Sequence, residues 1–295
     1  MGATMWPVTE RFGAEVGDID LSQPFSEAAC RVIAHAFERS AVLIFPDQRL
    51  RRAQHVACAR RFGPIDRSLL VHMDGATPRV PVELADVSNL DSRGAILAHD
   101  DRLRLCMLGN QLWHTDSACK HVPAKASLRY QRAIAQTGGQ TACADLRAAW
   151  DALPAAMQAR GEGLVAEHAI AYSRAKLGFA MSKSEQQALP PVQQVLVRTH
   201  PASGRTSLSL AAHAGRILGM TDQAGTALLE ELTAFATQRQ FVYSHRWRVN
   251  DLVIWDNRCT MHRGRPFDDQ RWKRDAQRAT VEDVANTLEQ EGIRV

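Results

Sequence analysis

The sequence predicts a mainly β fold with helices on one side, as in a β-sandwich or a jelly-roll barrel with α decoration. Three observations support this. Residues 241–280 are strand-like, residues 41–45 form a short apolar run, and residues 222–238 form the clearest amphipathic helix. No repeat, low-complexity tract or linker divides the 295 residues, so we expect a single domain spanning residues 1–295.

Strands and helices alternate in the first sixty residues. Residues 15–21 alternate loosely between apolar and polar side chains and predict an opening strand, and residues 41–45 predict a buried strand that stops at a proline. Between them, residues 26–40 place apolar side chains on one helical face, behind a serine that can cap the helix. Residues 51–62 predict a second helix, which ends before Gly63-Pro64.

Residues 66–110 have a different character. They mix Asp, Gly, Pro and Arg with short apolar stretches. A stretch this irregular inside a compact domain is often a lid or a binding loop, and the alternative is a few short strands joined by turns. We expect this region to act as a lid or to help bind a substrate.

Regular elements return in the second half of the chain. Residues 128–135 predict a strand, and Asp145 can cap a helix over residues 146–159. After the amphipathic helix, residues 251–255 and 272–281 predict two strands joined by turn residues.

The composition favours a globular protein without nucleic-acid or membrane partners. Hydrophobic residues make up 45% of the chain and charged residues 23%. The net charge is +4, and the sequence has no long run of like charges. A site for small acids accounts for the basic excess equally well. The six cysteines form no C-x-x-C pair, and we see neither a signal peptide nor a run long enough to span a bilayer. We therefore expect a cytoplasmic protein with reduced thiols, and the sequence is compatible with a homo-oligomer.

The most informative feature is the run Trp113-His114-Thr115-Asp116, together with His262 far downstream. In an extended segment residues i and i+2 lie on one face, so His114 and Asp116 can point at the same ion. Two imidazoles and one carboxylate suit a ferrous ion and leave coordination positions open for a co-substrate and oxygen.

Spacing alone does not identify the ligands, because two more His-x-acid pairs occur, beginning at His72 and His99. Both lie in the polar 66–110 region, and we expect them to be solvated. Leu112 and Trp113, by contrast, could wall a dry pocket beside His114.

Two arginines follow the second histidine. Arg274 and Arg278 are four residues apart on a predicted strand, so they face the same side, about 13 Å apart at about 3.3 Å per residue. Buried guanidinium groups need anionic partners. Those partners are either structural carboxylates of the protein or two separate acids, one from a co-substrate and one from a substrate.

Two other classes use part of this constellation. Histidines and a carboxylate also bind zinc in hydrolases, although the sequence contains no H-E-x-x-H helix. A non-catalytic β-barrel that binds a small acid would need only the arginines.

Several motifs occur in an order and at separations that are highly specific in combination. They are Gly13-Ala-Glu-Val-Gly-Asp-Ile-Asp-Leu21, Leu43-Ile-Phe-Pro46, Arg61-Phe-Gly-Pro64, Gly109-Asn-Gln-Leu-Trp-His-Thr-Asp-Ser117, Gly138-Gly-Gln-Thr141, Val197-Arg-Thr-His200, Trp255-Asp-Asn-Arg-Cys-Thr-Met-His-Arg263 and Arg274-Asp-Ala-Gln-Arg-Ala-Thr280. The chain thereby resembles, nearly end to end, the iron(II)/2-oxoglutarate-dependent dioxygenases of the taurine dioxygenase type. Within these it most resembles the 2,4-dichlorophenoxyacetate (aryloxyalkanoate) dioxygenases.

The resemblance implies a double-stranded β-helix and a role for each motif. It implies that His114, Asp116 and His262 bind Fe(II), and that Thr141 and Arg274 hold 2-oxoglutarate, with Arg274 at the distal carboxylate. The positions that it implies near the main substrate are Arg278, at the acidic group, and Asn110, His200 and His213. For His200 and His213 a structural role is the open alternative.

The implied reaction couples oxidative decarboxylation of 2-oxoglutarate by O2 to hydroxylation of a small carboxylic acid. An aryloxyalkanoate would be cleaved to a phenol and an oxo acid, and a sulfonate such as taurine or another aromatic acid is the alternative. Two positions depart from the family pattern. Asp47 stands where glycine is common, and Val71-His72 stand where phenoxyacetate enzymes have a basic residue, so the substrate can differ.

Overall fold

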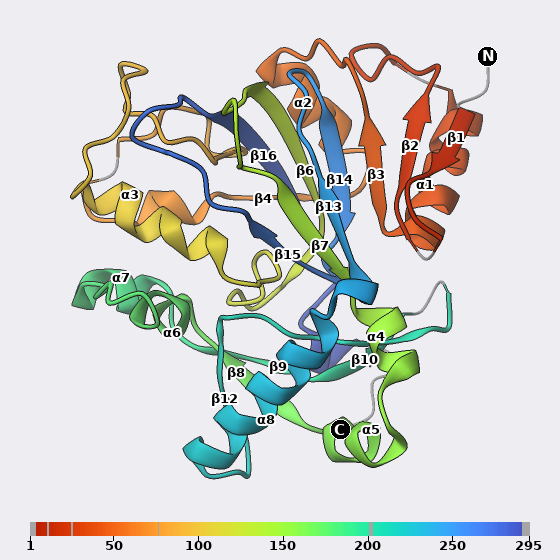
Figure 1. The fold of residues 1–295 in the computed structure, drawn as a ribbon, viewed down its shortest axis with the longest axis vertical. Helices are drawn as coiled ribbons and strands as arrows, with labels where there is room; N and C mark the ends of the chain where they lie inside the picture. Colours follow the sequence, from red (N-terminus) through yellow and green to blue (C-terminus); the bar gives the residue numbers. More distant parts are fainter. Residues whose placement is uncertain (1–3, 11, 25, 76, 201–202, 291–295) are drawn as a thin grey trace.

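The largest sheet has eight strands and forms the frame of the molecule (Figure 1). The computed structural model describes residues 4–10, 12–24, 26–75, 77–200 and 203–290. The strand order is β1-β2-β3-β14-β6-β16-β4, with β5 also paired to β16, and all pairs are antiparallel except β2 with β3. The strands are β1 (Thr4–Pro7), β2 (Ala14–Gly17), β3 (Val42–Phe45), β4 (Ile65–Asp66), β5 (Ala85–Asp86), β6 (Ala124–Ala133), β14 (Leu252–Asp256) and β16 (Asp275–Glu282).

Three smaller sheets complete the β structure. They are β13-β7-β15 (Val242–His245, Thr141–Asp145, Thr260–Gly264), β12-β8-β9 (Ala214–Ile217, Val165–His168, Val192–Val195) and β10-β11 (Val197–Thr199, Thr206–Leu208). Cys143 of β7 packs against Val253 and Trp255 of β14, so the first of these sheets lies against the large one. The described strands do not close into a barrel, and the expectation of a mainly β fold with helices is confirmed.

Helices cover the outer faces of the sheets. α1 packs Ile33 and Phe37 onto Leu43 of the large sheet, and α8 packs Leu228 and Leu232 into the core of the second half of the chain. The helices are α1 (Glu27–Ser40), α2 (Arg52–Ala59), α3 (Arg102–Met107), α4 (Leu146–Ala152), α5 (Ala155–Gly161), α6 (Ile170–Ala175), α7 (Lys183–Ala188) and α8 (Asp222–Ala236), with short 3-10 helices at Leu69–His72, Leu108–Gln111, Arg239–Phe241 and Thr287–Glu289. None of the helices within the described residues is long and apolar enough to cross a membrane.

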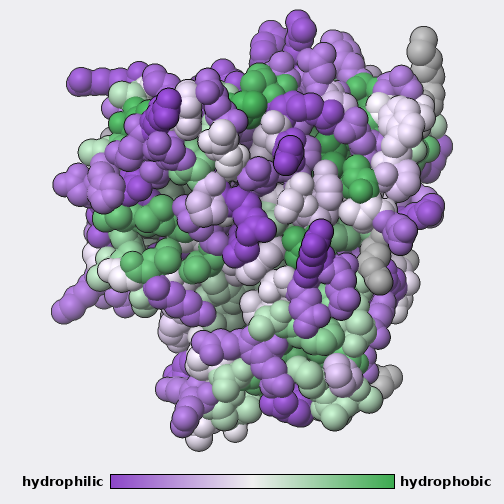
Figure 2. All heavy atoms as spheres, in the orientation of Figure 1, coloured by the Kyte–Doolittle hydropathy of each residue, from purple (hydrophilic) through white to green (hydrophobic). Residues whose placement is uncertain are grey.

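The space-filling view shows a mostly hydrophilic surface on the drawn face (Figure 2). Hydrophobic side chains gather beside the place where α3 lies in Figure 1.

Strand β6 shows how the sequence separates core from site. Leu128 and Tyr130 pack into the core beneath α1 and α2. Because side chains alternate across a strand, Ser127, Arg129 and their neighbours face the opposite side, toward β7 and β15. This inner face carries polar groups that are nevertheless buried, which is unusual unless they have partners.

The predicted elements are found with small shifts, and one is wrong. Ser26 caps α1 by accepting a hydrogen bond from Ala29 N at 3.2 Å, as expected. The single helix predicted over residues 146–159 is instead two, because Pro154 separates α4 from α5. Leu153 is extended (φ −70°, ψ 133°), since the α conformation is disfavoured before proline.

In the 66–110 region, the residues that the structure describes form only short strands and helices. The strand predicted over residues 15–21 is shorter, spanning Ala14–Gly17.

Candidate metal and acid-binding site

Two histidines and one aspartate converge between the sheets. The ligand atoms of His114, Asp116 and His262 all lie within 4.8 Å of one another, and all three residues are buried. His262 belongs to β15, and His114 follows the 3-10 helix Leu108–Gln111. Reciprocal backbone hydrogen bonds of 3.0 and 2.8 Å join His114 to His262, so an isolated β-bridge fixes the approach of these distant segments.

Each imidazole has a ring nitrogen that is free to bind a metal ion at the centre of the cluster. Nδ1 of His114 lies 2.7 Å from the carbonyl oxygen of Leu112, a contact that only an N–H satisfies, so Nε2 is the unprotonated nitrogen. His262 Nε2 lies 3.4 Å from Asp116 Oδ2, and its ring stacks near Trp255 with centroids 4.5 Å apart. Burial lowers the pKa of both histidines, which keeps them in the neutral form that binds metals.

Asp116 is held ionised and oriented by its neighbours. Ser127 donates to Oδ2 at 2.7 Å, Asn257 Nδ2 donates to Ser127 at 2.9 Å, and Arg278 forms a short ion pair with Oδ1. Burial would raise the pKa of Asp116, but Arg278 and the two imidazoles hold it well below its usual range. The donor set of two neutral imidazoles and one carboxylate fits a divalent transition metal such as Fe(II).

The other His-x-acid pairs are excluded from this cluster. His72 and His99 are exposed, as expected for solvated residues.

A first, small cavity adjoins the cluster and is lined by the predicted co-substrate residues. Thr141 Oγ1 accepts hydrogen bonds from Trp247 Nε1 at 3.0 Å and from Arg129 at 3.2 Å, which leaves its own proton to donate. Arg274 Nε is buried without a hydrogen-bond partner, and burial lowers the pKa of Arg274 to about 10. The lining residues are Val87, Asn110, His114, Arg129, Thr141, Trp255, His262, Gly264, Arg274 and Arg278.

A second cavity shares Val87, Asn110 and Arg278 with the first. Its walls combine apolar side chains such as Met73, Met107 and Ile170 with the guanidinium groups of Arg174 and Arg278. It therefore offers both basic groups for an acid and an apolar surface for a hydrophobic body.

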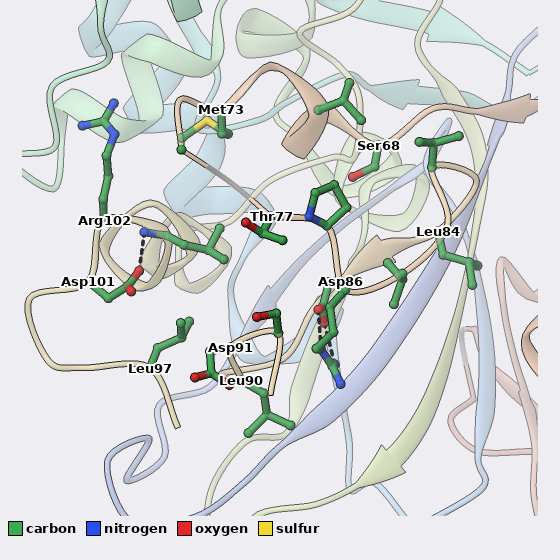
Figure 3. Close-up of a pocket in the computed structure, with 18 of the residues that line it drawn as sticks. Ser68, Met73, Thr77, Leu84, Asp86, Leu90, Asp91, Leu97, Asp101 and Arg102 are labelled. Carbon is green, nitrogen blue, oxygen red and sulfur yellow. Dashed lines mark hydrogen bonds and ion pairs between the residues drawn. The ribbon is translucent and has the colours of Figure 1, made fainter. Parts of the chain in front are cut away.

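An outer cavity of about 450 Å³ continues from there, sharing Ser68, Met73 and Asp86 with the second cavity. Figure 3 shows this outer cavity, with Ser68, Met73, Leu90 and Arg102 around it and the ion pair between Arg79 and Asp86 at its edge. Its described lining comes entirely from residues 68–103.

The structure does not bring His200 to the cluster. His200 Nε2 lies 3.0 Å from Glu38 and 3.7 Å from Asp256, in a buried network that Arg258 completes by pairing with both carboxylates. The three acid and imidazole groups satisfy a metal-like spacing, but Arg258 already pairs with both carboxylates. This network joins α1 to β14, and His200 lines neither inner cavity.

His213 lies beside the cluster. Its ring centroid is 6.0 Å from that of His114, and its Nδ1 lies 3.0 Å from Ser173 Oγ. It lines neither inner cavity, so its contact in the structure is with His114 and α6.

Two arginines of the site were missed from the sequence. Arg174 of α6 lines the second cavity, and Arg129 of β6 lines the first. The glycine of the Gly109-Asn-Gln motif was an indirect signal for Arg174. A Cβ atom at Gly109 would lie 2.5 Å from Cζ of Arg174, so the glycine makes room for the arginine side chain. No local pattern marks Arg129, because its place depends on which strand pairs with β6.

Comparison with known proteins gives consistent matches along the chain. The family profile described as taurine catabolism dioxygenase TauD, TfdA family, matches residues 6–280. The chain is 41% identical over 280 residues to the alpha-ketoglutarate-dependent 2,4-dichlorophenoxyacetate dioxygenase of Cupriavidus pinatubonensis, covering 95% of this chain and 97% of that protein. It is 35% identical to the (S)-phenoxypropionate/alpha-ketoglutarate-dioxygenase of Sphingobium herbicidovorans, with 89% of each chain covered.

A solved structure is similar throughout. The crystal structure of AAD-2 in complex with Mn(II) and N-oxalylglycine superposes with a TM-score of 0.93 at 42% identity, covering 97% of this chain and 100% of that one.

Proposed function

Because the chain belongs to the taurine catabolism dioxygenase TauD, TfdA family, we propose that it is an iron(II) dioxygenase that uses 2-oxoglutarate to hydroxylate a small aromatic acid. The observation that carries the proposal is the buried His114–Asp116–His262 cluster, with an unpaired arginine in the adjoining cavity. The 2-oxoglutarate-dependent relatives favour this chemistry over a zinc hydrolase or a non-catalytic acid-binding barrel.

The residues present fit both the metal and the co-substrate. His114, Asp116 and His262 would hold Fe(II) through two neutral imidazoles and one carboxylate. Thr141, with its free hydroxyl proton, and Arg274, with its unpartnered Nε, would hold 2-oxoglutarate at its distal carboxylate. When bound, the iron and 2-oxoglutarate together activate O2 and supply the oxidant for hydroxylation.

The protein's own contribution is to orient the substrate and to exclude water. Arg278 pairs with Asp116 of the metal cluster and also lines the second cavity. It would therefore place the substrate's acidic group close to the reacting centre. Asn110 lines both cavities and would contact substrate near the same point. Hydroxylation of an aryloxyalkanoate next to its ether oxygen gives a hemiacetal that separates into a phenol and an oxo acid.

The apolar side chains in the second cavity favour an aromatic acid over a sulfonate such as taurine. Met73, Met107 and Ile170 offer an apolar surface to an aromatic ring, whereas taurine carries a charged amine and no apolar body. We therefore propose aryloxyalkanoates, or aromatic acids of similar shape, as the substrate class.

We also propose roles for two larger parts of the chain. Residues 66–110 would form the substrate-binding wall, because the outer cavity is lined by residues 68–103. The large sheet and the β13-β7-β15 sheet would be the two halves of a double-stranded β-helix within one domain, since they pack together around the metal cluster.

The test is turnover of the Asp116→Ala variant with a panel of aryloxyalkanoates, cinnamates and sulfonates. We expect iron-dependent succinate release above the uncoupled background with an aryloxyalkanoate in the unmodified protein, and none in the variant. Asp222→Ala, which removes an exposed carboxylate at the start of α8, is the matched control and should retain turnover. Unchanged succinate release by Asp116→Ala would reject the assigned metal site.

A further inference from the structure

The cavity beside the metal cluster contains one more positive charge than the co-substrate residues named above account for. Arg129 points into it from β6, 5% exposed, and no described carboxylate lies within ion-pair distance. Its Nε is buried without a partner, as is Nε of Arg274 in the same cavity. Buried charges in proteins are ordinarily paired, so two unpaired guanidinium groups in one cavity indicate a missing anion.

The neighbours of Arg129 hold it in place without neutralising it. Nη1 donates to Thr141 Oγ1 at 3.2 Å, Nη2 donates to Gln131 Oε1 at 3.0 Å, and the guanidinium lies 4.5 Å from the ring centroid of Trp247. All three contacts are to uncharged groups. The side chain is therefore fixed in advance, with its Nε–H uncommitted.

The surrounding charges make this position unfavourable until an anion is present. Arg129 stands directly opposite Arg278 in the β6–β16 register, and like charges in that position repel. Burial, together with Arg274 and Arg278, lowers the pKa of Arg129 well below its usual value. Because Asp116 already pairs with Arg278, the positive charges without a partner are those of Arg129 and Arg274, which a dicarboxylate dianion would balance.

We propose that Arg129 is a second co-substrate-binding arginine, which acts with Arg274 and Thr141 on the distal carboxylate and makes the site selective for a dicarboxylic 2-oxo acid. This assignment rests on the proposed function, because it takes the co-substrate to be 2-oxoglutarate. It adds a residue from β6, the strand that pairs with β16 just after Arg274, so the distal carboxylate would lie over the inner face of these two strands.

The experiment compares 2-oxoglutarate with 2-oxobutyrate, which lacks the second carboxylate. Isothermal titration calorimetry with the full-length, Mn(II)-loaded protein measures binding without turnover. In Arg129→Leu we expect affinity for 2-oxoglutarate to fall about 10-fold or more, the loss typical of one charge-assisted contact, with affinity for 2-oxobutyrate unchanged. Arg132→Leu makes the same change on β6 at an exposed position and should bind 2-oxoglutarate as the unmodified protein does.

Thermal unfolding of the metal-free protein supplies a second readout. Removing an unpaired buried charge should leave the melting temperature of Arg129→Leu no lower than that of the unmodified protein, and 2-oxoglutarate with Mn(II) should then raise it less. A structural arginine would instead lose stability on replacement.

Two results would overturn the assignment: unchanged 2-oxoglutarate affinity in Arg129→Leu, or an equal loss of affinity for 2-oxobutyrate. If the unmodified protein itself bound no 2-oxoglutarate, the proposed function would fail, which is a separate outcome.

Discussion

Ser127 should control metal affinity although it would not touch the metal. Its hydroxyl, fully buried, donates to Asp116 Oδ2 at 2.7 Å and accepts from Asn257 Nδ2 at 2.9 Å. Ser127→Ala removes a hydrogen bond to a charged group, so the unfolding free energy of the metal-free protein should fall by about 1.5–3 kcal/mol. The carboxylate also loses its orientation, and the loss of such an outer partner typically weakens metal binding by about 10- to 100-fold.

Ser207→Ala is the matched control for this change. Ser207 is equally buried, but it donates to the backbone carbonyl of Arg258 at 3.1 Å, away from the metal cluster. It should cost about 0.5–1.5 kcal/mol of stability, as for a neutral hydrogen bond, without changing metal affinity.

Calorimetric titration with Mn(II) and urea unfolding measure the two quantities separately. If Ser127→Ala folds and binds Mn(II) as tightly as the unmodified protein, then Ser127 does not orient a metal ligand and the reasoning is refuted.

Three further changes test charges and thiols. Arg278→Ala leaves buried Asp116 without its ion-pair partner, so urea unfolding of the metal-free protein should show a loss of about 3 kcal/mol, partly restored by Mn(II). Burial lowers the pKa of His168 from 6.5 to about 4, so the unfolded chain takes up the proton first and stability falls as the pH falls through that window. His168→Leu should remove roughly 3 kcal/mol of this acid sensitivity, measured by urea unfolding at pH 7 and pH 4. Cys30 is partly exposed and the other five cysteines are buried, so Cys30→Ser should abolish the fast phase of thiol labelling by Ellman's reagent.

Each of these has a clear contrary result. An Arg278→Ala protein as stable as the parent would mean that the ion pair contributes nothing to the metal-free state. A His168→Leu protein with the parent's full acid sensitivity would place the titrating group elsewhere. Fast labelling that survives Cys30→Ser would show that a buried thiol becomes accessible.

The metal cluster could be predicted from the sequence because its ligands lie in recognisable motifs. His114 and Asp116 are two residues apart, but two other His-x-acid pairs have the same spacing, so the family motifs around His114 and His262 were needed to select the ligands. The proposed roles of Thr141 and Arg274 depended on family resemblance, since nothing local to either residue indicates a ligand.

Other features depend on contacts between distant segments. Arg129 faces the cavity because β6 lies between β14 and β16, an order that local periodicity does not determine. His200 was expected near the substrate, but its partner Glu38 comes from α1 at the other end of the chain. The break at Pro154, in contrast, was readable, because proline and its preceding residue both disfavour a helix interior.

The outer cavity and the metal cluster are built by different parts of the chain. The cluster is fixed by β15, β6 and a bridge between distant segments, while the described outer wall comes from residues 68–103, which form few regular pairings. Mutations can therefore accumulate in that wall and alter which acid is admitted while the redox centre stays intact. Directed evolution toward a different acid substrate should therefore succeed most readily through changes in residues 68–103, with the metal ligands left as they are.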